Sequence, residues 1–289
     1  MRRRPTIQLI IATVLLQFSM LLLTEELRAE SYYRWQDERG VAHYTGERPP
    51  AEISAEKLIL NSGHGLYRVA KVFDGDTVRL EGGERVRLIG INTPEVAHRN
   101  RPTDPGGDAA SDYLRKLIEG ELVRLEYGAE RRDKYGRLLA HLFTPEGENI
   151  NVLLLSGGYA HVVIKLPNVR LLQKYFAAER GAREAGLGIW GFPQFKVHKI
   201  EEAAGFRNTF RRLQGVIRRV EEKRSAWLLH FDSGVKALIR KEHLASFIRG
   251  GRHPNRLSGK RVIIRGWVHS SRGKPLIRLR HAKSIETID

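Results

Sequence analysis

Short apolar segments bounded by polar residues, glycine and aspartate recur between positions 67 and 143 of the chain. Such runs predict β-strands, here at 68–73, 77–80, 85–91, 122–127 and 138–143. Because these strands follow one another closely and helices enter late, the pattern favours a small closed barrel over a doubly wound parallel sheet.

Three segments carry the helical spacing of apolar residues. The third has the clearest apolar face, formed by Leu171, Leu172, Tyr175, Phe176 and Ala178. Strands and helices together predict an α+β fold. Capping residues and stop glycines place the helices between Asp108 and Gly120, between Asn149 or Asn151 and Gly157, and between Pro167-Asn168 and Gly186.

A second group of strands is predicted in residues 213–289, at 213–220, 226–231, 235–239, 262–268 and 277–279, with a helix at 243–249. The pattern is similar to that of an OB-type barrel and indicates a second, small, mainly β domain. We interpret residues 196–212 as a basic linker before it. Trp227 and Trp267 lie among aliphatic neighbours, so we expect both in the core.

The first 60 residues carry a signal-like segment and a hairpin. Arg2, Arg3 and Arg4 precede an apolar run at 7–23, and Ala29 ends a short polar stretch. This order is typical of a secretory signal at 1–29, with a retained membrane anchor as the alternative because of the length of the run. Either way, we expect a periplasmic or secreted protein. Residues 30–60 predict a short aromatic hairpin module with its turn at 37–40.

Charge and cysteine content narrow the function. The absence of cysteine excludes disulfides, thiolate metal sites and cysteine nucleophiles. The net charge is +17, and Lys plus Arg exceed Asp plus Glu by 23 to 8 in residues 196–289, whereas residues 30–195 hold 23 of each. Such an excess can be a solubilising surface, but its density in one segment favours an anionic polymer as partner: nucleic acid first, then an acidic membrane or cell-wall polymer.

Candidate chemistry lies in three turns, DGDT at 74–77, RVRLIGINTPE at 85–95 and DKYGR at 133–137. Asp-Gly between apolar runs is by itself a hairpin signal. Arg87 is a cation inside an apolar strand and needs an anion, so an ion pair with Asp76 or Glu95 is a purely structural alternative. Together, however, two arginines and carboxylates at strand ends are what phosphodiester cleavage requires: cations for the phosphate, oxygen ligands for a metal and a group that activates water.

The order DGDTV, RLIGINTPE, DKYGR, then a helix after Pro167-Asn168 that ends in Gly188-Ile189-Trp190, resembles the staphylococcal nuclease family over residues 66–191. The resemblance implies a nuclease domain at 66–195, built as a five-stranded OB-type barrel with three helices. It also implies Ca²⁺-dependent hydrolysis of DNA and RNA.

The resemblance also implies roles for individual residues. Arg87 and Arg137 would bind the phosphate and stabilise the transition state, and Glu95 would orient or deprotonate the attacking water. Asp76, Asn92 and the Thr93 carbonyl would hold the ion. Asp133, Lys134 and Tyr135 would line the nucleotide pocket.

Two departures from the family pattern matter. Asn92 stands where the family usually has a second metal-binding aspartate, and one negative charge fewer should weaken Ca²⁺ binding. Val163 and Lys165 replace two tyrosines, which should weaken the grip on the base. The rival hypothesis is therefore a faded protein that keeps the barrel and only binds nucleic acid or the cell envelope. For the nuclease we expect DNA, RNA or both as partners, and no obligate protein partner is evident.

Overall fold

The computed structural model describes residues 31–36, 42–45, 56–59, 65–97 and 102–288. The chain divides into two compact units, residues 1–62 and residues 63–289. The expected signal or anchor at 1–29 and the hairpin turn at 37–40 lie outside the described residues. Within the described part, no helix has both the length and the apolar character that a membrane crossing requires.

The N-terminal unit contains a three-stranded antiparallel sheet. The predicted hairpin is confirmed, because β1 (Ser31–Gln36) pairs with β2 (Ala42–Thr45). A third strand, β3 (Glu56–Ile59), pairs with the other edge of β1. Since an isolated two-stranded hairpin is barely stable in water, this third strand supplies part of the support that the hairpin needs.

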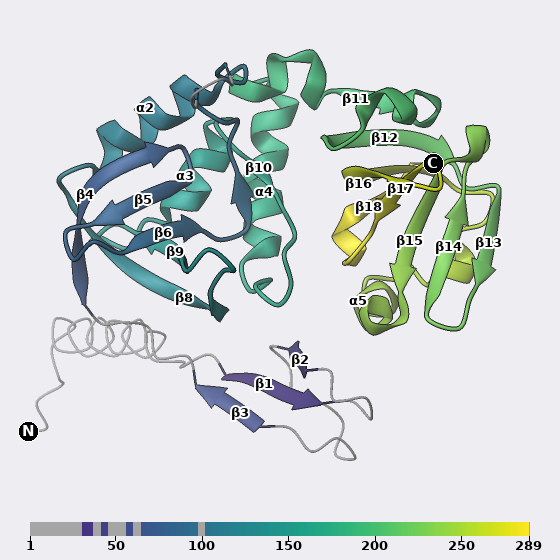
Figure 1. Ribbon diagram of the computed structural model, residues 1–289, viewed down its shortest axis with the longest axis horizontal. Helices are drawn as coiled ribbons and strands as arrows, with labels where there is room; N and C mark the ends of the chain where they lie inside the picture. Colours follow the sequence, from purple (N-terminus) through teal and green to yellow (C-terminus); the bar gives the residue numbers. More distant parts are fainter. Residues whose placement is uncertain (1–30, 37–41, 46–55, 60–64, 98–101, 289) are drawn as a thin grey trace, which may run out of the picture. The chain divides into compact units, whose positions relative to one another are not determined.

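Five strands close the predicted barrel in the order β4-β5-β6-β9-β8 (Figure 1). Its interior is filled by inward-facing aliphatic side chains, among which Val69, Val78, Val86 and Leu125 are fully buried. The strands are β4 (Leu66–Asp74), β5 (Thr77–Leu80), β6 (Arg85–Leu88), β8 (Leu122–Arg132) and β9 (Leu138–Phe143).

The strand predicted at 85–91 is broken in two. Gly90 has φ +79°, a conformation that favours glycine, and the chain leaves the barrel there. The continuation, β7 (Ile91–Asn92), pairs with β10 (His161–Val162) instead. This break turns Asn92 and the residues after it away from the barrel ladder.

Three helices accompany the barrel, α2 (Gly107–Ile118), α3 (Ile150–Ser156) and α4 (Leu172–Glu184). Asn149 caps α3, as one of the two alternatives predicted. The expected cap by Asp108 is wrong, because left-handed Gly106 precedes α2 and Asp108 lies in its first turn. The expected start of α4 at Pro167-Asn168 is also wrong, because the Asn168 side chain bonds the backbone of Glu130 and the helix begins at Leu172.

The C-terminal residues form a mainly β region with a separate apolar core, as predicted. Between 197 and 288 the strands pair as one eight-stranded sheet, whose edges are β11 and β13 and whose order does not close into a barrel. A short helix, α5 (Leu244–Arg249), accompanies it. The strands are β11 (Val197–Lys199), β12 (Phe210–Val216), β13 (Arg219–Glu222), β14 (Ala226–His230), β15 (Lys236–Arg240), β16 (Arg261–Ser271), β17 (Lys274–Arg278) and β18 (Ile285–Ile288).

The stretch 196–212, expected to be a linker, is part of this sheet. Strand β11 runs parallel to β12, with Val197 opposite Arg212. Ile200 and Ala203 are fully buried in the C-terminal core. The basic residues of this stretch therefore belong to a folded segment, which is held to the C-terminal core by its buried apolar side chains.

The two tryptophans expected in the core have different environments. Trp227 is buried, with 8% of its surface exposed, as predicted. Trp267 is 46% exposed, so the core prediction is wrong for this residue.

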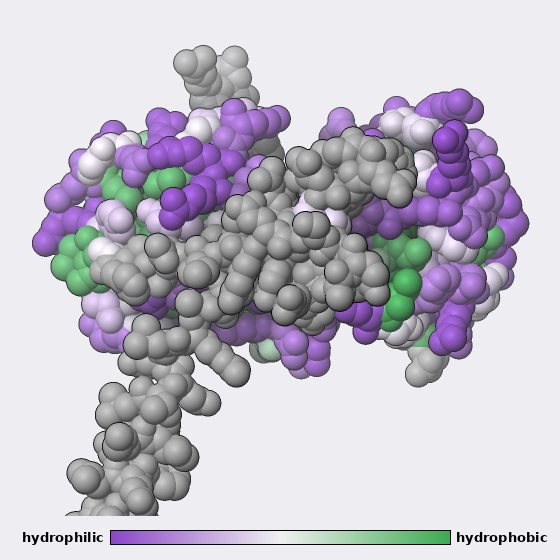
Figure 2. Space-filling view, turned by 90° about the horizontal axis from the view of Figure 1, so that it is seen from below, coloured by the Kyte–Doolittle hydropathy of each residue, from purple (hydrophilic) through white to green (hydrophobic). Residues whose placement is uncertain are grey.

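On the face of the molecule shown in Figure 2, the coloured surface is mostly hydrophilic and apolar residues form small separate areas.

A buried ion pair joins helix α4 to strand β16. Glu179 is fully buried, and its carboxylate accepts hydrogen bonds from Arg265 at 2.5 and 2.9 Å and from the Val162 amide at 2.5 Å. Arg265 also donates to the Val162 carbonyl at 2.9 Å. Burial alone would raise the pKa of Glu179, but the attraction and hydrogen bonds of Arg265 outweigh burial and hold it below its ordinary value.

This pair gives a stability prediction. Replacing Glu179 with Gln leaves the Arg265 guanidinium buried without a counter-charge, so we expect the free energy of unfolding to fall by about 3–5 kcal/mol. Urea denaturation followed by circular dichroism measures it. Glu184→Gln, an exposed change near the end of the same helix, is the control and should lie within about 0.5 kcal/mol of the wild type. Equal stability of the two variants would contradict the prediction.

Candidate active site

The DGDT turn places Asp76 against the chain that follows β7. The turn packs closely here, because a Cβ added to Gly75 would lie 2.6 Å from the Thr93 side chain and 2.7 Å from that of Ala110 in α2. Asp76 is 5% exposed, and its carboxylate accepts a hydrogen bond from the Thr93 amide at 3.0 Å. The close packing against Thr93 and Ala110 therefore requires a glycine at this position.

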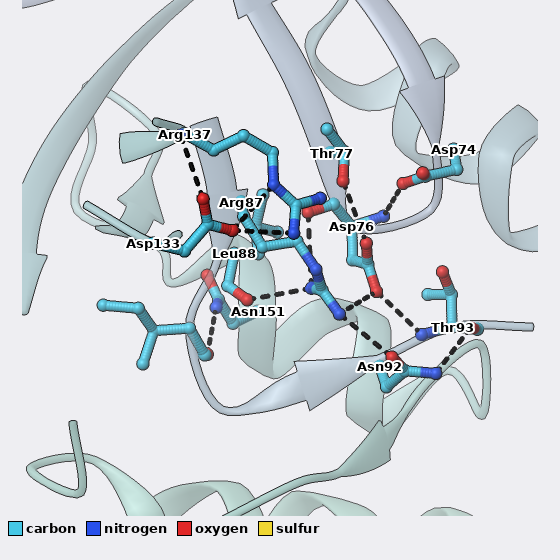
Figure 3. A network of polar contacts seen from close by, with 11 residues as sticks. Asp74, Asp76, Thr77, Arg87, Leu88, Asn92, Thr93, Asp133, Arg137 and Asn151 are labelled. Carbon is cyan, nitrogen blue, oxygen red and sulfur yellow. Dashed lines mark hydrogen bonds and ion pairs between the residues drawn. The ribbon is translucent and has the colours of Figure 1, made fainter. Parts of the chain in front are cut away.

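Arg87, on β6, lies at the centre of a polar network that draws in Asp76 and Asn92 (Figure 3). Its Nη2 is 2.7 Å from Asp76 Oδ2 and 3.0 Å from Asn92 Oδ1, and its Nη1 donates to the Leu88 carbonyl at 3.0 Å. Of the two ion pairs considered as a structural alternative, the one with Asp76 is therefore present.

The environment of Asp76 works against its negative charge. Burial raises the pKa of Asp76 to about 7, and repulsion by Asp74 adds to the effect, while the Arg87 guanidinium opposes it. A cation bound to this carboxylate would favour its ionised form in the same way that Arg87 does.

The DKYGR turn joins β8 to β9 and orients Arg137. The Asp133 carboxylate accepts hydrogen bonds from Arg137 Nε at 2.9 Å and from the Tyr135 amide at 2.9 Å, and lies 2.8 Å from Arg137 Nη2. Burial alone would raise the pKa of Asp133, but these bonds outweigh it and hold the pKa below its ordinary value. Asp133 therefore fixes the direction of the arginine.

The two other residues of this turn point outward. Tyr135 is 71% exposed, and the Lys134 ammonium lies 4.8 Å from the centre of its ring. Neither side chain borders the cleft described next. The structure thus separates Asp133 from Lys134 and Tyr135, three residues that the sequence analysis had grouped as one pocket.

One cleft of about 410 Å³ brings the two arginines together. Arg87, Asn92, Asp133 and Arg137 line it, although they come from β6, β7 and the turn between β8 and β9. Val163 and Lys165, the positions where the family pattern has tyrosines, line it as well. The cleft therefore brings together the two arginines that the resemblance assigns to the phosphate, whereas Glu95, assigned to the attacking water, does not line it.

Asp76, Thr93 and Glu95 do not line this cleft. Asp76 and Thr93 are buried, in contact with Arg87 and Asn92. Glu95 is exposed, three residues after Asn92, and its carboxylate has no partner among the described residues. The Glu95 backbone is held firmly, because its carbonyl accepts from the Asp104 amide at 2.9 Å and abuts Gly107, where a Cβ would lie 2.5 Å away.

Two supporting residues were not singled out for the site by the sequence analysis. Asn151 is fully buried and bonds both the Leu142 amide at 3.1 Å and the Ile89 carbonyl at 2.9 Å, which ties α3 to the break between β6 and β7. His161 pairs with Asn92 across the β7–β10 ladder. The only sequence signal for Asn151 was its place beside a helix start, where Asn149 takes the cap.

The oxygen atoms around Asn92 suit a divalent cation in type. A carboxylate from Asp76, the Asn92 amide oxygen and the Thr93 carbonyl are hard ligands of the kind that Ca²⁺ prefers. Each already accepts a hydrogen bond, from Arg87 in the first two cases and from Asn92 Nδ2 at 2.8 Å in the third. Within the described residues no three His, Cys, Asp or Glu side chains form a metal cluster, so the fit rests on one carboxylate and neutral oxygens.

Comparisons with known proteins place this site in a family. Residues 85–191 match the family model described as "Staphylococcal nuclease homologue". The chain is 40% identical over 127 residues to a thermonuclease of Staphylococcus intermedius, and the match covers 75% of that protein and 43% of this chain. This chain belongs to the staphylococcal nuclease family. The α+β fold with its closed barrel, which was expected from the resemblance, agrees with that membership.

Other relatives are also named as nucleases. A thermonuclease of Staphylococcus hyicus is 32% identical over 133 residues, covering 45% of this chain and 78% of that protein. Endonuclease YhcR of Bacillus subtilis (strain 168) is 33% identical over 158 residues, covering 50% of this chain and 12% of that protein. The family match ends at residue 191, so the C-terminal sheet lies outside it.

Buried histidines beside the site predict a pH dependence of stability. Burial lowers the pKa of His161 to about 3, with Arg265 adding to the effect, and burial also lowers that of His141 to about 3. Because the ordinary value is about 6.5, the unfolded chain binds more protons than the folded one between these values. The contribution of the histidines to stability is therefore full above pH 7 and falls as the pH drops, by up to about 1.4 kcal/mol per pH unit for each histidine, while the raised pKa of Asp76 acts in the opposite direction between about pH 4 and 7.

His161→Phe isolates one of these contributions. Both ring nitrogens of His161 lack a hydrogen-bond partner among the described residues, and the ring packs against Phe195 and Phe210. A phenylalanine should therefore fit, and the slope of stability against pH between 4 and 6 should become shallower by about 1.4 kcal/mol per unit. Denaturation at several pH values measures the slope, and an unchanged slope would count against a neutral buried His161.

Proposed function

We propose that this protein is a divalent-cation-dependent nuclease that hydrolyses phosphodiester bonds of DNA, RNA or both. The observation that carries the proposal is the convergence of Arg87 and Arg137 on one cleft, each oriented by its own carboxylate. Guanidinium groups held in this way bind the oxygens of a phosphate and stabilise the charge that develops in the transition state. The names of the thermonuclease and endonuclease relatives support the same activity.

The resemblance and the positions of the side chains support these roles. Arg87 and Arg137 hold the phosphate in the cleft, and Asp133 keeps Arg137 aligned toward it. Glu95, exposed on a firmly held backbone three residues after Asn92, would accept a proton from the attacking water as the water oxygen bonds to phosphorus and the bond to the leaving oxygen breaks. Divalent Ca²⁺ would be held by Asp76, Asn92 and the Thr93 carbonyl and would supply electrostatic stabilisation of the phosphate.

The rival function, a binding protein that has lost the metal, has one observation in its favour. The Asn92 amide nitrogen donates to the Thr93 carbonyl, the oxygen that a cation needs, and Arg87 engages the Asp76 carboxylate. A cation must displace both contacts. Against this rival stands Glu95, because a binder of phosphates gains little from an exposed, unpaired carboxylate three residues after Asn92.

Export remains part of the proposal. The arginines at 2–4 and the apolar run at 7–23 support a secretory signal or a membrane anchor, and hence a periplasmic or secreted nuclease. A fusion of residues 1–35 to a reporter enzyme that is active only outside the cytoplasm would test this part separately.

The catalytic proposal predicts the outcome of plasmid digestion. Arg87→Ala and Glu95→Ala should each lower the cleavage rate with Ca²⁺ by about 100-fold or more, because each removes a group that acts in the transition state. Arg85→Ala removes an exposed arginine from the same strand and should retain the wild-type rate.

Because Arg87 also holds Asp76 and the Leu88 carbonyl, thermal unfolding of each variant must accompany the assay. A loss of activity in Glu95→Ala with an unchanged melting temperature supports the catalytic role. Equal activity of the wild type, Arg87→Ala and Glu95→Ala would remove the proposed function.

Calcium binding separates the nuclease from the faded binder. Asn92→Asp adds a second carboxylate and removes the amide donor from the Thr93 carbonyl, so we expect Ca²⁺ to bind at least tenfold more tightly, since affinity follows ligand charge. Isothermal titration calorimetry measures the change, with Asn255→Asp as an exposed, charge-matched control. Measurable binding by the wild type supports the enzyme, whereas binding only by Asn92→Asp supports the rival.

A further inference from the structure

The cleft that holds Arg87 and Arg137 has a second wall, which comes from the C-terminal sheet. Residues of β12, β16 and β17 and of the segment after β17 line the same 410 Å³ space, namely Phe210, Arg265, Gly266, Trp267, Arg278 and Arg280. These residues lie beyond residue 191, where the match to the family ends. The C-terminal sheet is therefore part of the candidate active site.

This second wall presents one exposed aromatic ring. Trp267 is 46% exposed although its strand neighbours Ile264 and Val268 are fully buried. The edge of the indole is supported by Phe210, whose ring centre lies 6.4 Å away at an interplanar angle of 74°. An exposed indole in this cleft is a surface on which a flat ligand can stack. The opposite wall offers only Val163 and Lys165 where the family pattern has aromatic rings.

The same wall also carries unpaired positive charge. Arg278 and Arg280 are both exposed and flank Leu279, which is buried, so the two side chains leave the sheet on the same side. Neither forms an ion pair with a carboxylate in the described part of the chain. Burial, Arg278 and Arg280 together lower the pKa of His269, which lines the same cleft. Both cations are therefore available to an anionic ligand.

The wall is held in place by buried charge. Arg265, two residues before Trp267 on β16, bonds Glu179 of α4 and the Val162 carbonyl of β10. Val162 lies next to His161, which pairs with Asn92 in the catalytic network. Trp267 thus has a fixed position relative to Arg87, which is what a stacking site beside a reacting phosphate requires.

We propose that Trp267, Arg278 and Arg280 form a nucleotide subsite next to the scissile phosphate and that this subsite selects single-stranded nucleic acid. Trp267 stacks on an unpaired base, and the two arginines bind neighbouring phosphates. A base inside a duplex is already stacked on both faces, so it cannot use the indole without being unpaired. This inference rests on the proposed nuclease function for the identity of the adjacent phosphate.

Binding without cleavage tests the subsite independently of catalysis. The full chain in EDTA is titrated with a fluorescein-labelled ten-nucleotide oligothymidylate, and in parallel with a labelled duplex. Trp267→Ala should weaken single-strand binding by about 5- to 150-fold, the equivalent of one stacked base, whereas Trp267→Phe should keep most of the affinity. Duplex binding should change less than twofold in both variants.

The arginines are tested by salt dependence. Arg278→Ala should make the plot of log affinity against log salt shallower by about 0.7, the value for one single-strand phosphate contact. Arg224→Ala, which removes an exposed arginine from the turn between β13 and β14 outside this cleft, should leave the slope unchanged.

Each result either supports the subsite or overturns it. Equal single-strand affinity of Trp267→Ala and the wild type, or an equal loss for single strand and duplex, would overturn it. Equal salt slopes for Arg278→Ala and Arg224→Ala would do the same for the phosphate contacts. If the wild type binds as expected but never cleaves with any divalent cation, the proposed catalysis fails while the subsite stands. If it cleaves and Trp267→Ala binds normally, only the subsite fails.

Discussion

The contact between Arg87 and Asp76 is the constraint on which the site depends. Both side chains are largely buried, and a buried charge without a partner costs several kcal/mol. The pair therefore locks the DGDT turn against the break between β6 and β7. The pair also fixes Asn92 and Thr93, because Asn92 accepts a hydrogen bond from Arg87 and the Thr93 amide donates one to Asp76. Asp76, Arg87, Asn92 and Thr93 stay together because separating them would leave a buried charge without a partner.

The same contact competes with the proposed cation, because Arg87 already engages the carboxylate that the cation would use. The Asp76 carboxylate is shared between a guanidinium and a position suited to a metal ion, and burial raises its pKa to about 7. Asn92 lacks the charge of an aspartate, and its amide donates to the Thr93 carbonyl. A metal ion that binds here must gain more free energy from these oxygens than the present hydrogen bonds and ion pair supply. The proposed cation site thus keeps oxygen ligands and has one carboxylate fewer than the family pattern.

A second buried pair, between Glu179 and Arg265, extends the site beyond the family domain. It joins α4 to β16 and so turns the C-terminal sheet into a wall of the cleft. Val163 and Lys165 predict a weaker grip on a base, and the basic C-terminal residues favour an anionic polymer, first of all nucleic acid, as a partner. The structure places the exposed indole of Trp267 in the same cleft as Arg87 and Arg137.

The sequence alone determined the barrel strands, the Asn149 cap and the three turns that carry the chemistry, because strand periodicity, turn residues and capping are local properties of the chain. It did not determine that α4 starts at Leu172, that residues 196–212 belong to a sheet, or that Trp267 is exposed. Asn168 bonds a distant strand, β11 pairs with β12, and Arg265 draws β16 against α4. Each of these depends on contacts between residues far apart in the chain, and only the tertiary structure decides which of them form.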